Sequence, residues 1–181
     1  MAQVESLIAR VLQARSQVLE AVSGVSTDRG AWKPAPTEWS ITECVEHLVI
    51  AEQGTVGGTW AAVEGLRAGS PVWNGELIHR GLTIEEVVRR TWAPNQQAPD
   101  RALPRRGGSL GYWAAALENS QRLVDRLGEL LLGMDLEAVV FPHIVSGPLD
   151  ASQRLAFLRF HLDLHRKQIE AIRLDPRFGN G

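Results

Sequence analysis

The sequence has little cysteine, no excess of positive charge and no long apolar run. Its single cysteine, Cys44, excludes an internal disulfide bond, which fits a reducing compartment such as the cytoplasm. The 19 basic and 21 acidic side chains give a net charge of −2, whereas nucleic-acid-binding domains usually carry a basic patch. No stretch reaches the roughly 18 uninterrupted apolar residues of a membrane span. We therefore expect a cytoplasmic protein that binds neither nucleic acid nor membranes.

What is present is the composition of a globular protein. The chain has 181 residues, of which 44% are hydrophobic and 22% are charged, with 17 glycines and 9 prolines. These proportions are typical of a folded domain and not of a disordered or fibrous chain. The length is close to that of one ordinary domain, so we predict a single domain over residues 1–181.

Apolar residues recur at steps of three and four along most of the chain, which is the spacing of one helix face. Ser40 with Glu43, and Thr83 with Glu86, have the spacing of capping boxes, in which each side chain bonds the other residue's backbone N–H. Asp150, with Gln153 three residues later, marks a further helix start. The predicted long helices cover about 2–23, 41–66, 110–132 and 151–173, and a short one covers about 84–92.

The four long segments have similar lengths, which favours an all-α four-helix bundle. Residues 67–108 are rich in glycine, proline and arginine, so we expect a long irregular connection apart from its short helix. The best strand candidate, residues 138–141, is followed at once by Pro142, and we expect no strand there.

The last helix directs two histidines toward the core. On a helical wheel of residues 155–172, His161 and His165 fall near the middle of the apolar arc, and Gln168 is the one other polar residue within it. The charged residues occupy the opposite arc. The apolar arc comprises Leu155, Phe157, Leu158, Leu162, Leu164, Ile169 and Ile172.

Buried imidazoles need partners for their polar nitrogens, and a metal ion is one such partner. Histidines four residues apart stack on one helix face, and His47 on the second predicted helix is the natural third ligand. The alternative is a set of structural histidines that form hydrogen bonds in the core. A zinc-protease site is excluded, because residues 161–165 lack the glutamate of HExxH and Asp163 lies on the solvent arc.

Three motifs combine these residues with their neighbours: Trp39-Ser40-Ile41-xx-Cys44-xx-His47-Leu48, Phe141-Pro142-His143-xxx-Gly147-Pro148-Leu149 and Phe160-His161-xxx-His165-xx-Gln168-Ile169. They resemble motifs of the DinB/YfiT superfamily of small metal-binding helical proteins. The resemblance implies a four-helix bundle with an up-down-down-up path and a divalent metal held by His47, His161 and His165. It also implies a homodimer.

The resemblance further implies an enzyme that acts on a small molecule, because the family includes thiol S-transferases and metal-dependent hydrolases. Three histidines leave a coordination position open, at which a metal can activate water or a low-molecular-weight thiol cosubstrate. Histidine ligands suit zinc or nickel, and also iron or manganese. The alternative is a non-catalytic, stress-related metal-binding or structural bundle protein.

We consider four further residues of the sequence one by one. His143, just before the last predicted helix, is a candidate acid or base, and Gln168 is a candidate for lining the site. His79 has no evident partner. We expect Cys44 to be a buried small hydrophobe and not a reactive thiol.

Overall fold

The protein is mostly helical, as expected, and carries one small sheet. Its structure is a computed structural model that describes residues 2–94 and 96–178. The long elements are α1 (Ala2–Val22), α3 (Ile41–Arg67), α5 (Leu110–Asn119) followed by α6 (Gln121–Leu131), and α7 (Ala151–Leu174). The short ones are α2 (Thr27–Ala31), α4 (Ile84–Thr91), the 3₁₀ helix η1 (Asp100–Ala102), β1 (Val140–His143) and β2 (Gly147–Asp150).

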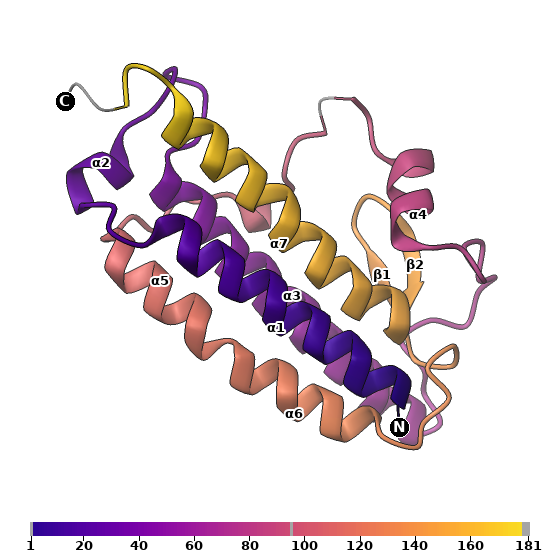
Figure 1. Cartoon of the computed structure of the whole chain (residues 1–181). Coiled ribbons are helices and arrows are strands. Elements are labelled where there is room, and N and C mark those ends of the chain that lie inside the picture. Colours follow the sequence, from indigo (N-terminus) through magenta and orange to yellow (C-terminus); the bar gives the residue numbers. More distant parts are fainter. Residues whose placement is uncertain (1, 95, 179–181) are drawn as a thin grey trace.

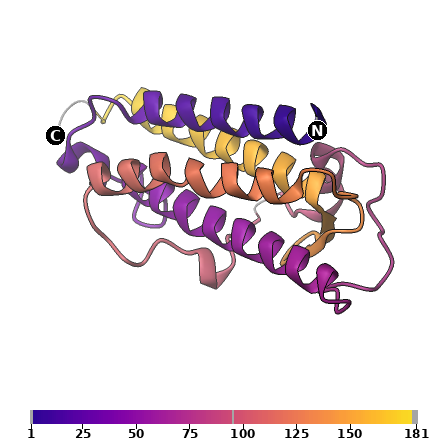
Figure 2. The same ribbon diagram turned by 90° about the horizontal axis from the view of Figure 1, so that it is seen from below.

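The long helices lie side by side along one direction, with the core between them (Figures 1 and 2). Helices α1 and α7 begin at the end of the molecule where α3 and α6 finish (Figure 1). Helix α7 packs against both α1 and α3, so the predicted histidine helices are direct neighbours. No helix in the described part of the chain is long and apolar enough to cross a bilayer.

One apolar core joins all the long helices. Fully buried side chains such as Val18 of α1, Leu48 of α3, Leu117 of α5 and Leu155 of α7 belong to it. Their spacing along each helix places them on one face, and removal of that face from water stabilises the packing. Leu164 is the exception to the predicted arc, because 39% of it is exposed. The single domain predicted over residues 1–181 stays a prediction.

The predicted helix starts are confirmed. The Ser40 hydroxyl accepts from the Glu43 N–H at 3.2 Å, and the Glu43 carboxylate accepts from the Ser40 N–H at 2.8 Å. The same reciprocal bonds open α4 and α7. Each box satisfies backbone donors that have no partner inside the helix, which explains why these helices begin where they do.

The helix predicted over 110–132 is divided at Ser120. The Ser120 hydroxyl donates to the carbonyl of Ala116 at 3.1 Å, and the Ser120 N–H bonds the same carbonyl at 3.0 Å. A serine that bonds back to the preceding turn often bends a helix. The backbone of Ser120 keeps near-helical angles, φ −59° and ψ −23°, so the apolar spacing continues from α5 into α6.

A β-hairpin stands where we predicted no strand. Strands β1 and β2 pair antiparallel, and Pro142, which we expected to prevent a strand, lies opposite Pro148. Both strands of a two-stranded sheet are edges, where a missing N–H is tolerated. Gly147 has φ +78°, a left-handed conformation that favours glycine at the turn. The hairpin contacts α3 and α7 and brings His143 to the side of the histidine helices.

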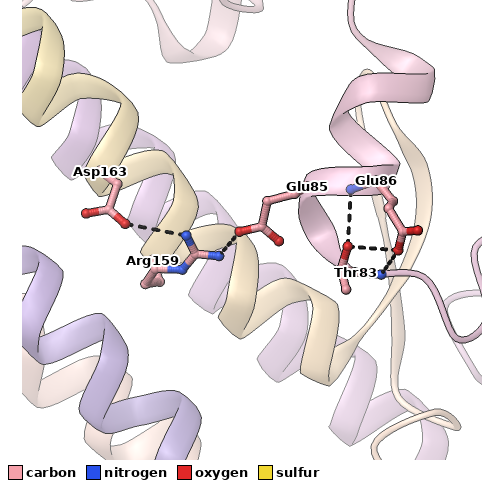
Figure 3. Close-up of polar contacts among 5 residues, drawn as sticks. All are labelled: Thr83, Glu85, Glu86, Arg159 and Asp163. Carbon is pink, nitrogen blue, oxygen red and sulfur yellow. Dashed lines mark hydrogen bonds and ion pairs between the residues drawn. The ribbon is translucent and has the colours of Figure 1, made fainter.

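The predicted short helix in the long connection is confirmed as α4, and its partner is α7. Figure 3 shows Arg159 of α7 between Glu85 of α4 and Asp163 of its own helix, where the distance to Asp163 is 3.4 Å. The same picture shows Thr83 and Glu86, whose reciprocal bonds cap the start of α4. The ion pair therefore holds the connection against the helix that carries two of the histidines.

Candidate metal centre

Three histidines from two helices meet in the interior. Nε2 of His161 on α7 lies 3.0 Å from Nε2 of His47 on α3 and 3.1 Å from Nε2 of His165, one turn further along α7. All three side chains are buried, and one ligand nitrogen from each lies within 4.8 Å of the others. The structure thus brings together the three residues that the sequence suggested as ligands.

Hydrogen bonds on the far side of two rings fix which nitrogen carries the proton. Nδ1–H of His47 donates to the carbonyl of Ala102 at 2.7 Å, and Nδ1–H of His165 donates to Oε1 of Gln168 at 2.9 Å. A carbonyl oxygen can only accept, so each ring has its proton on Nδ1 and its lone pair on Nε2. Both lone pairs are therefore directed toward Nε2 of His161.

This donor set fits a divalent cation. Lone pairs that face one another at hydrogen-bond distance repel unless a proton or a cation lies between them. Two nitrogens bound at about 2.0–2.1 Å to one ion lie about 2.9–3.4 Å apart at the usual coordination angles. The separations of 3.0 and 3.1 Å lie in that range. The backbone and amide acceptors behind the rings are the partners that orient metal-binding histidines.

The electrostatics keep the cluster neutral and able to bind metal. Burial lowers the pKa of His47, and burial together with the neighbouring histidines lowers that of His161. Burial, followed by the charge of His47, lowers the pKa of His165 to about 3. Ligand histidines must be unprotonated, so these shifts keep all three available at neutral pH.

A pocket of about 980 Å³ gives access to the cluster, since all three histidines line it. Pockets of this size hold small molecules and are usually apolar with a few polar groups. Aromatic walls come from four separate segments of the chain: Trp39, Trp92, Phe141 and Phe157. A cation bound by the histidines would thus face a space large enough for a substrate.

A model of the DinB superfamily matches residues 10–169, a span that contains all three histidines. The chain belongs to the DinB superfamily. No curated protein matches it. The family assignment agrees with the resemblance of the three motifs, 39–48, 141–149 and 160–169, all of which lie within the matched residues.

Of the two further site candidates in this DinB-superfamily chain, Gln168 lies in the site and orients His165, as described above. His143 lies in the pocket wall, where its Nδ1 accepts from the N–H groups of Val145 at 3.3 Å and Ser146 at 3.1 Å. Burial, followed by the charges of two arginines, lowers the pKa of His143 to about 3. The neutral ring therefore has its proton on Nε2 and can donate it in a hydrogen bond.

Two other residues lie outside the centre. Nε2–H of the buried His79 donates to the carbonyl of Ser146 at 2.7 Å, which gives it a partner at the hairpin turn. Cys44 is fully buried, and burial raises its pKa to about 12, so the thiol is protonated at neutral pH.

Sequence reasoning missed two contacts of the DinB-superfamily site. The Trp39 ring stacks on His165, with centroids 5.9 Å apart, and lies 4.7 Å from His47. Trp39 precedes the Ser40 cap, and that position alone gives no signal for a contact with the last helix. The Ala102 carbonyl has no sequence signal, because its place depends on the path of an irregular connection.

Proposed function

We propose that the protein is a divalent-metal-dependent enzyme that acts on a small molecule, with His47, His161 and His165 as the metal ligands. The observation that carries this proposal is the convergence of three Nε2 atoms, at 3.0 and 3.1 Å, in the wall of one large pocket. The reaction class is thiol S-transfer or hydrolysis, and zinc or nickel is the first choice of metal.

A bound divalent ion would lower the pKa of a water or a thiol at its open position. The residues of the chain have separate tasks. The Ala102 carbonyl and Gln168 hold two ligand rings in orientation. Trp39 covers His165 and limits its contact with water. His143 presents a neutral N–H donor to the pocket, suited to a polar atom of the substrate.

The helix directions in Figure 1 support the up-down-down-up four-helix bundle that the family resemblance implies. A non-catalytic protein, in which a metal only ties α3 to α7, is the alternative. The pocket favours the enzyme, because a purely structural metal site has no need of a space of about 980 Å³. The homodimer and the cytoplasmic location stay predictions.

Metal content tests the site. Protein purified without an affinity tag and loaded with zinc should contain about one ion per chain, and the His161→Ala and His161→Gln variants should contain almost none. His79→Gln is the matched control, since His79 is also buried but bonds the Ser146 carbonyl of the hairpin turn and does not line the pocket. Equal metal in wild type and His161 variants would contradict the assignment.

Turnover tests the reaction. Metal-loaded wild type should convert members of a panel of thiol–electrophile pairs and hydrolysable esters and amides, and chelation should abolish that turnover. His161→Gln should also be inactive, whereas His79→Gln should retain activity. A full complement of metal without turnover would favour the structural alternative.

A further inference from the structure

A buried arginine near the metal centre has no ionic partner. Only 2% of Arg154, in the first turns of α7, is exposed. Its Nε donates to the carbonyl of Phe141 at 2.8 Å, and its guanidinium carbon lies 4.6 Å from the centre of the Phe141 ring. The terminal nitrogen Nη2 is buried and makes no hydrogen bond within the described residues. An N–H group left in this way costs free energy unless a ligand supplies an acceptor.

A second arginine adds to the positive charge of Arg154, and no carboxylate in the described residues pairs with it. Arg101, in η1, is exposed and lines the same pocket as Arg154. Burial, followed by the charge of Arg101, lowers the pKa of Arg154 to about 9, so the guanidinium remains charged at neutral pH. Across residues 2–94 and 96–178, no carboxylate forms an ion pair with either arginine.

Two acidic residues line the pocket, Glu38 and Asp175, and both lie near Arg177, because Asp175 pairs with Arg177 and the charge of Glu38 acts on it. Asp175 follows the last turn of α7, whereas Arg154 lies near its start, and a helix of that length separates them by roughly 30 Å. The ion pair between Asp175 and Arg177 measures 2.7 Å. The Arg154 end of the pocket therefore has an unbalanced positive charge.

The arginines are close to the metal centre without being part of it. Their charges both act on His143. The His143 ring packs on Phe157, with centroids 4.6 Å apart, and Phe157 stacks on the ligand candidate His161 at 5.3 Å. The rings of His143 and Phe157 thus lie between the arginines and His161, a span that a small molecule can bridge.

We propose that Arg154 and Arg101 form an anion-binding subsite, which holds a carboxylate or phosphate group of the substrate or cosubstrate while its reactive end faces the histidine cluster. The inference rests on the proposed function, in that the pocket is taken as the substrate pocket. A guanidinium matches carboxylate and phosphate oxygens with parallel hydrogen bonds. The anion would balance the positive charge of the two guanidinium groups that line the pocket.

Calorimetric titration of the full chain with benzoate, phenyl phosphate and benzamide tests this subsite. The aromatic ring suits the pocket walls, and benzamide is the neutral analogue of benzoate. Wild type should bind at least one of the two anions about tenfold or more tighter than benzamide, in both zinc-loaded and chelator-treated protein. The tighter of the two anions identifies carboxylate or phosphate as the group bound.

Arg154→Gln should remove the preference for the anions over benzamide. Arg101→Gln should reduce that preference severalfold and leaves the buried Arg154 in place. Arg126→Gln is the matched control, because Arg126 is an exposed arginine of α6 outside the pocket and its loss changes the net charge equally. It should bind all three probes as wild type does.

Three outcomes would overturn the subsite: equal binding of anions and benzamide by wild type, an unchanged preference in Arg101→Gln and Arg154→Gln, or a preference found only with zinc present. The zinc content of each variant is measured in parallel. A chain that binds no zinc but prefers the anions keeps the subsite and loses the metal-dependent function. A chain that binds zinc but shows no preference for the anions keeps the metal site and loses the anion-binding subsite.

Discussion

The carbonyl oxygen of Ala102 lies 2.7 Å from Nδ1 of His47. This contact connects the 3₁₀ helix of the long irregular connection to a ligand candidate on α3, 55 positions earlier in the chain. It turns the Nε2 lone pair of His47 toward His161, which lies 3.0 Å away. The connection is therefore part of the candidate centre, because it determines which nitrogen of the ring can bind a metal.

Gln168 should control metal affinity without binding the metal. Its Oε1 accepts from Nδ1–H of His165, so Gln168→Leu leaves that N–H without its acceptor. We expect zinc affinity to fall by about 10–100-fold, the usual effect of losing a partner behind a ligand histidine. Competition with a chromophoric chelator measures the change.

Gln168→Glu is the control for size and position, since a carboxylate accepts the same hydrogen bond. It should hold zinc at least as tightly as wild type, because a negative acceptor makes the imidazole a stronger donor. If Gln168→Leu binds zinc as tightly as wild type, the contact has no role in holding the ring.

Acid should destabilise the metal-free protein through its buried histidines. The pKa of His143 and of His165 is lowered to about 3, whereas a histidine of the unfolded chain titrates near 6.5. Between these two pKa values the unfolded chain binds more protons than the folded chain. The free energy of unfolding is therefore highest above pH 6.5 and falls as the pH drops toward 3. At pH 5.5 each such histidine lowers it by about 1 kcal/mol.

Urea denaturation of chelator-treated protein at pH 7.5 and 5.5 measures this loss. In His143→Gln the drop between the two pH values should be smaller than in wild type by about 1 kcal/mol, because one proton-linked group has been removed. Identical drops in the two proteins would show that the His143 pKa is the same in the folded and unfolded states.

The regular parts of the fold follow from local sequence, and so does the placement of two histidines on the inner face of α7. The Ser40–Glu43 and Thr83–Glu86 boxes mark helix starts because their bonds involve residues only three apart. The placement of His161 and His165 on one inner face needs only the helical repeat. Such features depend on neighbours in the chain and not on the tertiary arrangement.

The remaining features depend on distant contacts. The hairpin around Pro142 is supported by its contacts with α3 and α7, and it tolerates Pro142 and the opposing Pro148 because both of its strands are edges. The buried, unpaired state of Arg154 depends on that hairpin, since the Phe141 carbonyl and ring hold the guanidinium. No spacing rule in the sequence reports contacts of this kind.

Two neighbouring glycines of α3 should respond in opposite ways to alanine. A Cβ at Gly58 would come 2.1 Å from the ring of Phe141, whereas a Cβ at Gly57 would meet nothing within 4 Å. Both changes improve helix propensity by about 1 kcal/mol. Gly57→Ala should therefore stabilise the protein, while Gly58→Ala should lose about 1–3 kcal/mol through displacement of the ring.

The difference between the two urea midpoints is the measurement, and each glycine serves as the control for the other. Displacement of Phe141 also disturbs the carbonyl and ring that hold Arg154, so Gly58→Ala should weaken benzoate binding as well. Equal stabilisation by the two alanines would mean that the ring moves aside freely.

Loss of one partner of the buried ion pair between Arg15 of α1 and Glu52 of α3 should destabilise the protein far more than replacement of both partners. Both side chains are almost fully buried, and Nε and Nη1 of Arg15 and Oε2 of Glu52 make no hydrogen bond within the described residues. Glu52→Leu leaves a buried guanidinium without its partner and should cost about 3–5 kcal/mol of unfolding free energy. The double variant Arg15→Met/Glu52→Leu should recover most of that loss in urea denaturation, because two apolar groups of similar size need no partner. A double variant as unstable as Glu52→Leu would instead mean that the pair itself contributes net stability between α1 and α3.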